Sequence, residues 1–316
     1  MSLITRFLDP KNDFAFKRIF GSEKHKKLLM SFLNAVLQNQ LAAPIQSLTF
    51  LKPAQDPELA AKKQSIVDVL CRDKAGVQYI VEMQVASQAG FEERAQYYAS
   101  KAYVSQMNEG DQYKALKEVI FLAIADYVVF PHKVAYKSSH CTLDQQTGEN
   151  DLDKIFFTFV ELPKFKARFK KEKRKLADLT LEERWYYFLS HAPSTTNKEL
   201  RILSSSPPIE AAYQVLNYFN FNEREVLTYE LAKKNKLDEQ AIRDKIREDA
   251  EKRGMKKGME KGMEKGIEKG IEKGIEKGIQ QEKQELAKQM LQDGEAIEKM
   301  VRWTGLREEQ IKQLIQ

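Results

Sequence analysis

Apolar and polar residues alternate with helical and strand-like periods along roughly the first 230 residues. Helices are predicted where apolar side chains recur every three or four positions, over residues 13–20, 23–37, 91–107, 181–189 and 209–219. Strands are predicted where short apolar runs occur, over residues 65–72, 77–86, 119–129 and 155–161. Strands separated by helices indicate an α/β domain whose sheet is covered on both faces.

Two neighbouring predicted strands each carry a carboxylate inside an apolar run. Asp68 lies between Val67 and Val69, and Glu82 follows Val81. An ionised carboxylate in such surroundings is costly unless it is compensated, and a bound metal ion is one form of compensation. The two acids therefore become candidate site residues if the strands bring them together.

The turn between these strands decides whether the carboxylates meet. Asp73 can lead the turn and Gly76 can adopt positive φ at its end, which favours a three-residue loop. Such a loop pairs Asp73 with Val77, and counting back places Asp68 opposite Glu82. A two-residue loop would place the carboxylates on opposite faces of the hairpin.

In the favoured register Asp68, Glu82 and Gln84 share one face, while Val81 and Met83 point into a core. Two carboxylates beside a polar amide form a candidate oxygen-ligand site for Mg²⁺ or Mn²⁺. The alternative interpretation is a half-exposed hairpin with ordinary surface acids.

A four-residue repeat occupies residues 254–279, with glycine at every fourth position followed by Met or Ile. On a helix these two stripes wind slowly, because four residues exceed one turn by about 40°. Each glycine costs roughly 0.8–1 kcal/mol relative to alanine, and like charges meet at i,i+4. We therefore expect either a mobile spacer or a helix that associates with a second copy of the chain.

The last residues predict a small helical hairpin with a break at Gly305. Its spacing is compatible with a helix-turn-helix. Against that motif, Glu308 and Glu309 open the second helix and would repel phosphate. A packing or oligomerisation cap is the alternative.

Three regions are therefore expected. They are a compact domain over residues 1–230, a charged helix with the glycine repeat over 231–282, and a C-terminal helical hairpin over 283–316.

Composition excludes several classes of protein. The chain is 42% hydrophobic and 31% charged, and its N-terminus lacks the apolar core of a secretion signal. The apolar run over residues 119–130 is interrupted by Asp126 and is too short to span a bilayer. Cys71 and Cys141 are too few for a disulfide framework or a structural zinc site. A cytoplasmic protein without a membrane partner is expected.

The net charge of +6 is modest, but positive charge concentrates over residues 164–175, which hold eight cations and one acid. On a helix, Phe165 and Phe169 would anchor one face. The outward face would then carry Lys164, Lys166, Arg168, Lys170 and Lys171. Such a stripe binds the phosphate backbone without sequence specificity, although many charge runs are only solvated faces.

No other catalytic chemistry is indicated. The four histidines have neither zinc-ligand spacing nor a neighbouring nucleophile motif, and the sequence has no P-loop or dinucleotide fingerprint.

Several segments resemble the Rpn family of recombination-promoting nucleases and transposases, which belongs to the PD-(D/E)XK nuclease superfamily. These segments span the chain: Phe7–Gly21, the Asp68…Glu82-Met83-Gln84 hairpin, Arg94 with Tyr98, Glu161–Phe165, Trp185–Leu189 and the glycine repeat. The resemblance implies an α/β restriction-endonuclease-like core, with a mixed central sheet flanked by helices and a C-terminal helical extension. It also implies Mg²⁺-dependent cleavage of DNA.

The resemblance assigns roles to individual residues. Asp68 matches the aspartate of the superfamily motif and Glu82 the glutamate of its E-x-K element, so both would hold Mg²⁺. Gln84 stands where the superfamily usually has lysine, and it would orient the attacking water by hydrogen bonding instead of supplying charge. Asp13 matches an additional acid of some members. Lys17 is a candidate for the missing cation.

Arg94 and the basic residues 164–175 would hold the DNA backbone under this resemblance. The expected function is a Mg²⁺-dependent endonuclease that cuts double-stranded DNA with little sequence preference and promotes recombination. One alternative is a degenerate nuclease that binds DNA or a partner without cutting. The other is a self-assembling protein whose glycine repeat governs its oligomer size.

Overall fold

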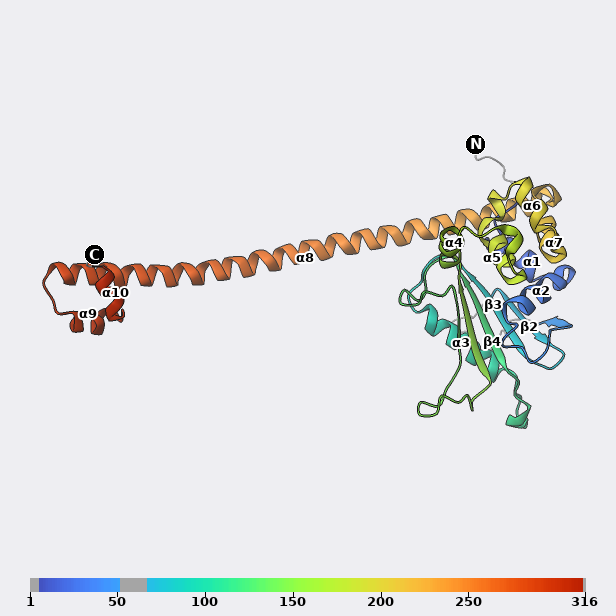
Figure 1. Cartoon of the computed structure of the whole chain (residues 1–316), viewed down its shortest axis with the longest axis horizontal. Coiled ribbons are helices and arrows are strands. Elements are labelled where there is room, and N and C mark those ends of the chain that lie inside the picture. Colours follow the sequence, from blue (N-terminus) through green and yellow to red (C-terminus); the bar gives the residue numbers. More distant parts are fainter. Residues whose placement is uncertain (1–5, 52–66, 315–316) are drawn as a thin grey trace. The chain divides into compact units, whose positions relative to one another are not determined.

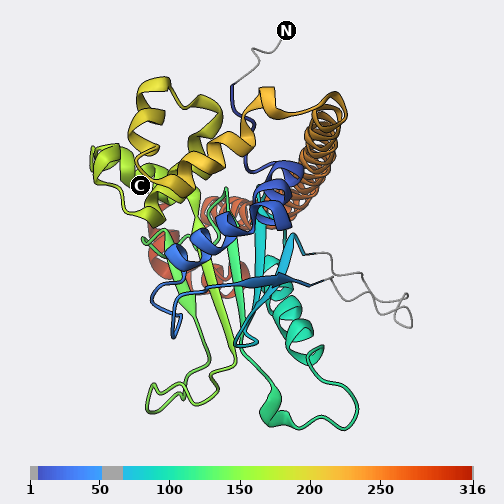
Figure 2. The same cartoon turned by 90° about the vertical axis from the view of Figure 1, so that its right-hand side faces the viewer.

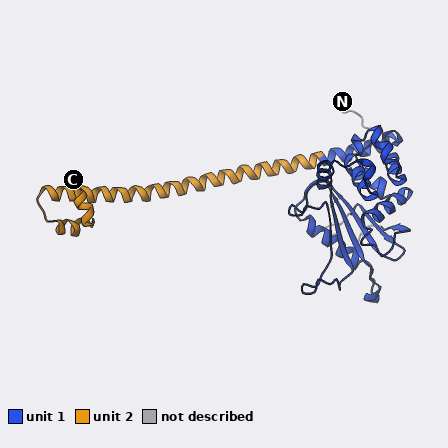
Figure 3. Ribbon diagram, in the orientation of Figure 1, with its two compact units in different colours: residues 1–236 blue, residues 237–316 orange. Residues whose placement is uncertain are grey.

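The computed structural model describes residues 6–51 and 67–314 of the chain. The chain divides into two compact units, residues 1–236 and residues 237–316 (Figure 3). Residues 65 and 66 of the first predicted strand lie outside the described residues. Within these described ranges, none of the helices combines the length and the apolar stretch needed to cross a bilayer.

The first unit is built on one mixed sheet with the strand order β1-β2-β3-β4-β6-β5 (Figure 1). The strands β1, β2 and β3 are antiparallel, β3, β4 and β6 run parallel, and β5 is antiparallel to β6. Their bounds are β1 Leu48–Phe50, β2 Val69–Asp73, β3 Gln78–Gln84, β4 Val119–Ala125, β5 Lys137–His140 and β6 Ile155–Glu161.

Helices cover both faces of this sheet. Helix α3 (Phe91–Val104) packs on one face, where Ala95 and Ala99 are fully buried against strand residues such as Phe121. The other face is covered by α1 (Asp13–Phe20), α2 (Lys26–Val36), α5 (Leu181–His191) and α7 (Pro207–Leu216). Figure 1 shows α3 on one side of the strands and α1 and α2 on the other, and α1 and α2 lie in front of the strands in Figure 2. The fold is the α/β restriction-endonuclease-like core that the sequence predicts.

Short elements are what the sequence patterns miss. The edge strands β1 and β5 have only three and four residues, and β5 is polar, so neither contains an apolar run of ordinary strand length. Helix α6 (Asn197–Leu203) is also unpredicted. The helix predicted over 23–37 opens with a 3₁₀ turn, and the one predicted over 91–107 ends at Val104.

The remaining helix of the sheet domain and its 3₁₀ turns lie in the connections. They are α4 (Leu162–Lys171) and the turns Glu23–His25, Tyr113–Ala115, Leu176–Asp178, Ala192–Ser194 and Tyr218–Asn220.

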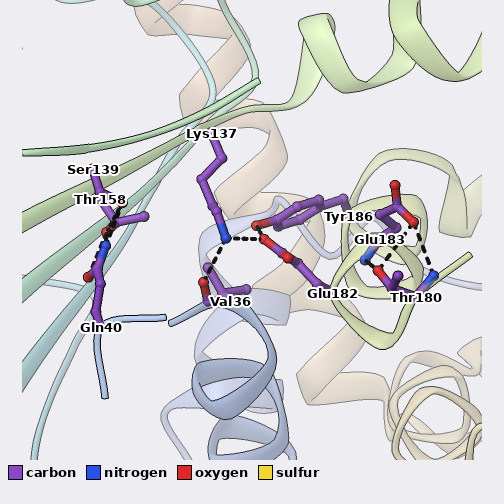
Figure 4. A network of polar contacts seen from close by, with 9 residues as sticks. All are labelled: Val36, Gln40, Lys137, Ser139, Thr158, Thr180, Glu182, Glu183 and Tyr186. Atoms are coloured by element: carbon purple, nitrogen blue, oxygen red, sulfur yellow. Dashed lines mark hydrogen bonds and ion pairs between the residues drawn. The ribbon is translucent and has the colours of Figure 1, made fainter. Parts of the chain in front are cut away.

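Polar contacts join the edge strand β5 to two helices (Figure 4). The Lys137 ammonium donates to Glu182 Oε1 at 2.6 Å and to the Val36 carbonyl at 3.1 Å, and the Tyr186 hydroxyl donates to the same Glu182 oxygen at 2.7 Å. These contacts tie β5 to the end of α2 and the start of α5. An inward-pointing charge on an edge strand also discourages pairing with another sheet.

Helix α8 (Glu223–Gln292) begins in the first unit and continues through the glycine repeat. The predicted Met/Ile stripe is exposed along its whole length, from 80% at Met255 to 48% at Ile279. A Cβ added to any of the seven repeat glycines would meet nothing within 4 Å. Within the described residues of the second unit, no other element covers this face.

Two short helices follow α8. They are α9 (Ile297–Thr304) and α10 (Glu308–Gln313), separated by Gly305 in the left-handed conformation at φ +68°. Together with the end of α8 they form a small apolar core of Ala287, Met300, Leu306 and Ile311.

Candidate active site

The hairpin of β2 and β3 has the predicted three-residue loop. The Asp73 N–H donates to the Val77 carbonyl at 3.0 Å, and Gly76 adopts φ +93°. Val69 pairs with Val81 in the ladder, so Asp68, in the bend just before β2, lies opposite Glu82. The predicted register is confirmed.

The side chains of Asp68 and Glu82 accept hydrogen bonds from the backbone at each other's position. The Asp68 N–H donates to Glu82 Oε2 at 3.1 Å, and the Met83 N–H donates to Asp68 Oδ2 at 2.8 Å. The ladder between β2 and β3 ends at Val69, so these side chains satisfy backbone groups that would otherwise lack partners. Glu82 is only 5% exposed, so the interpretation as an ordinary surface acid is wrong for this residue.

Burial makes ionisation of both acids costly. Burial raises the pKa of Asp68 to about 6, although the Met83 N–H and the charge of Lys17 oppose the change. Burial, together with the negative charge of Asp68, raises the pKa of Glu82 to about 7. A bound cation would favour the ionised form of both groups.

Three further predicted residues surround this pair. The Gln84 Nε2 donates to Glu82 Oε1 at 3.0 Å. Lys17 on α1 lies 3.7 Å from Asp68 Oδ1 and 2.7 Å from Asp13 Oδ1. Burial lowers the pKa of Lys17, but the hydrogen bond to Asp13 and the nearby carboxylates raise it overall. Asp13 is close enough to Asp68 to raise the pKa of that carboxyl.

Arg94 reaches the same region from helix α3. Its charge is among the influences that lower the pKa of Glu82 against the effect of burial. Its Nη1 donates to Gln88 Oε1 at 2.6 Å, and its Nε and Nη2 are buried without a hydrogen-bond partner among the described residues. The structure thus brings Asp13, Lys17, Asp68, Glu82, Gln84 and Arg94 together.

The basic segment only partly follows the prediction. Phe165 is buried and Phe169 packs beside it, as expected for the anchoring face of α4. The expectation of an outward-facing Lys164 is wrong, because its ammonium donates to Glu161 Oε2 at 2.5 Å and to the Phe130 carbonyl at 2.7 Å. The helix ends at Lys171.

The other basic residues of α4 remain accessible to different degrees. Lys170 and Lys171 are exposed. Arg168 pairs with Glu172 at 2.8 Å, and Lys166 pairs with Asp126 at 3.1 Å. The predicted DNA-binding residues of this segment are therefore not equally available.

Sequence reasoning missed a charged cluster at the end of β4. Asp126 accepts from Lys11 at 2.7 Å and from Lys166, and its N–H donates to the Gln84 carbonyl at 2.8 Å. Polar groups at the carboxyl ends of parallel strands are typical of α/β sites. The acid at the end of the apolar run over residues 119–125 was the available signal.

The donor set at this site fits a magnesium ion. Magnesium is usually bound through one or two carboxylates and keeps several waters, and Asp68 with Glu82 supplies two carboxylates linked by short backbone contacts. No group of three or more His, Cys, Asp or Glu side chains suited to a metal occurs within residues 6–51 and 67–314. Two carboxylates leave coordination positions for water, as magnesium sites in proteins usually do.

Comparison with known proteins identifies a family. The family model described as PD-(D/E)XK nuclease family transposase matches residues 10–245. Searches of curated proteins and of solved structures found no significant match.

Proposed function

Because the chain belongs to the PD-(D/E)XK nuclease family transposases, we propose that it is a Mg²⁺-dependent endonuclease that cuts double-stranded DNA with little sequence preference. Breaks of that kind would promote recombination. The observation that carries the proposal is the Asp68–Glu82 pair, in which Asp68 accepts from the N–H next to Glu82 and Glu82 accepts from the N–H of Asp68.

Asp68 and Glu82 would hold Mg²⁺, and Mn²⁺ would serve in its place. The Met83 carbonyl is a third candidate ligand, since the N–H and C=O of one strand residue point to the same edge and its N–H already bonds Asp68. A bound divalent cation supplies water activation and charge neutralisation at the phosphate.

Gln84 would orient the attacking water, because its amide lies beside Glu82 and carries no charge. In the hydrolysis, the water oxygen forms a bond to phosphorus and one ester P–O bond breaks. The departing ester oxygen gains a proton, so the products are a phosphate monoester and an alcohol. Lys17 would contact the phosphate, since its side chain is 40% exposed beside Asp68.

The DNA backbone would be held by the accessible cations of α4. Lys170 and Lys171 are exposed, and Lys166 and Arg168 become available if phosphate replaces their present carboxylate partners. Contacts of this kind are independent of sequence and weaken steeply with salt. This is why little sequence preference is expected.

A plasmid-nicking assay tests the proposal. Wild-type protein, Asp68→Asn and Glu82→Gln are compared in Mg²⁺, in Mn²⁺ and with a chelator. We expect cleavage only by the wild type and only with metal, while all three proteins bind DNA in the chelator. Cleavage that persists in Asp68→Asn or in the chelator would refute the proposed site.

One observation favours the alternative of a degenerate nuclease that binds without cutting. All four carboxylate oxygens of the pair already contact protein groups, namely Lys17, the Met83 N–H, Gln84 and the Asp68 N–H. A metal must share or displace these contacts. Wild-type protein that binds DNA but never nicks it in either metal would establish this alternative.

We also propose that the glycine repeat joins two copies of the chain. A helix with seven glycines would lose roughly 6 kcal/mol relative to alanine, and its Met/Ile stripe is exposed. A second helix of the same four-residue period would cover the stripe in matching register, as small residues permit close approach. Deleting residues 254–279 and measuring the mass in solution tests this, and an unchanged mass would indicate a spacer instead.

A further inference from the structure

The Arg94 guanidinium donates one hydrogen bond, from Nη1 to Gln88 Oε1 at 2.6 Å, but two of its nitrogens, Nε and Nη2, are buried without a partner among the described residues. No described carboxylate forms an ion pair with the guanidinium. Two other partly buried arginines differ, because Arg18 pairs with Glu225 and Arg174 with Glu183. A buried charge is costly unless nearby groups compensate it, so the surroundings of Arg94 must explain its presence.

Two aromatic rings of the same helix, α3, lie beside the guanidinium. Its carbon lies 5.2 Å from the centroid of Phe91 and 6.0 Å from that of Tyr98. Phe91 and Ile80 belong to the core between α3 and the strands. Glu82 follows Ile80 by two positions on β3 and therefore projects to the same face.

The neighbouring charges agree with this placement. Burial raises the pKa of Tyr98, and Arg94 lowers it while Glu82 and Asp68 raise it. The charges of Arg94, Glu82 and Asp68 therefore all act on the Tyr98 hydroxyl. Arg94 comes from α3, on the face of the sheet opposite to α1, which carries Lys17.

We propose that Arg94 supplies, from helix α3, the positive charge that a lysine at position 84 would supply in an E-x-K site. It acts as a positioning residue through Glu82 and not as a contact to DNA, because its free nitrogens are buried. This inference rests on the proposed nuclease function. It revises the role in DNA binding that the sequence resemblance gives to Arg94.

The positive charge can come from position 94 instead of position 84 because Gln84 also lies beside the Glu82 carboxyl. Its Nε2 is 3.0 Å from Glu82 Oε1, so a lysine ammonium at position 84 would reach that carboxyl as well. Two adjacent carboxylates repel each other, and a fixed cation on either side offsets the repulsion. A positive charge at either position, 94 or 84, would thus keep Glu82 oriented for the metal.

The test moves the charge from one position to the other. Arg94→Gln is compared with wild type and with the double variant Arg94→Gln/Gln84→Lys. For Arg94→Gln we expect kcat to fall by about 10²-fold or more, with the DNA Kd measured in chelator unchanged within about threefold. In the double variant the ammonium at position 84 should restore at least about tenfold of the lost rate.

Controls separate the possible failures. Arg184→Gln removes another arginine, one that hydrogen-bonds to Leu179 and Ser205, and should leave cleavage unchanged. If thermal unfolding shows that Arg94→Gln does not fold, Arg94→Met takes its place in both comparisons. The long methionine side chain can still pack against Phe91 and Tyr98.

Two outcomes would overturn the inference. A DNA Kd weakened about tenfold or more would make Arg94 a phosphate contact. If the double variant folds but its cleavage rate does not recover, a positive charge beside Glu82 does not support cleavage. Failure of the wild type to cut with metal would refute the proposed nuclease function instead, so the two failures are distinguishable.

Discussion

The backbone N–H of Asp68 donates a 3.1 Å hydrogen bond to the carboxyl of Glu82. The reciprocal contact, from the Met83 N–H to Asp68 Oδ2, is 2.8 Å long. These two bonds replace the backbone hydrogen bonds of the β2–β3 ladder beyond Val69. The candidate active site therefore also forms the open end of the hairpin. Stability and chemistry should therefore respond together to changes here.

Stability should fall as the pH rises from about 4 to about 7 in the presence of a chelator. The folded-state pKa of Asp68 is raised to about 6 and that of Glu82 to about 7. Both lie above the unfolded values, so the native state binds more protons in this window and loses its advantage as the pH passes through the folded values.

Chemical denaturation at several pH values measures this effect. The free energy of unfolding should drop by up to a few kcal/mol across the window. In Asp68→Asn/Glu82→Gln the drop should be much smaller, and Mg²⁺ should reduce it in the wild type. An equal slope in the double variant would contradict the assignment to these two acids.

Gly76→Ala should lower the free energy of unfolding by about 1–2 kcal/mol. Gly76 has φ +93°, and an added Cβ would lie 2.9 Å from Lys117 Cγ. The companion variant Gly76→Ala/Lys117→Ala removes the contact and keeps the strained φ. We expect most of the loss to remain in it, as measured by urea denaturation, whereas full recovery would assign the loss to the contact alone.

Lys164→Met should destabilise the fold with little effect on DNA binding. The Glu161 side chain is 1% exposed, and its carboxyl accepts from Lys164 and from the Phe130 N–H. Removing the lysine leaves a buried carboxylate without its cation, which typically costs about 3–5 kcal/mol. Thermal unfolding should show the loss, and a stable variant with weak DNA binding would contradict the structural role.

Lys170→Gln/Lys171→Gln should give the opposite result. Both side chains are exposed, so stability should change by less than about 0.5 kcal/mol. DNA binding should weaken, and the slope of log K against log salt should become shallower by about 2 if each lysine neutralises one phosphate. Fluorescence anisotropy at several salt concentrations measures this, and an unchanged slope would remove α4 from the DNA surface.

Local chemistry made the centre of the molecule predictable. The turn residues Asp73 and Gly76 fixed the register, and with it the position of Asp68 opposite Glu82. The apolar run over residues 155–161 matched strand β6 residue for residue. These features depend on neighbours in the sequence, so the sequence displays them.

Features that depend on distant partners were not predictable. Lys164 looks like part of a basic stripe until the Phe130 carbonyl, 34 positions earlier in the chain, is placed beside it. In the cluster of Lys11, Lys166 and Asp126, the two contacts join residues 115 and 40 positions apart. The burial of Arg94 likewise arises from packing of α3 on the sheet, which no spacing reveals.

The reciprocal bonds of the acid pair have an evolutionary consequence. Asp68 accepts from the N–H next to Glu82, and Glu82 accepts from the N–H of Asp68, so a descendant that had abandoned hydrolysis would still gain two hydrogen bonds at the end of the hairpin by keeping both residues. Intact acids in a related sequence are therefore poor evidence that it still cuts. Gln84 contacts Glu82 but makes no such bond to the backbone. A loss of activity should therefore appear first as substitutions at positions such as 84.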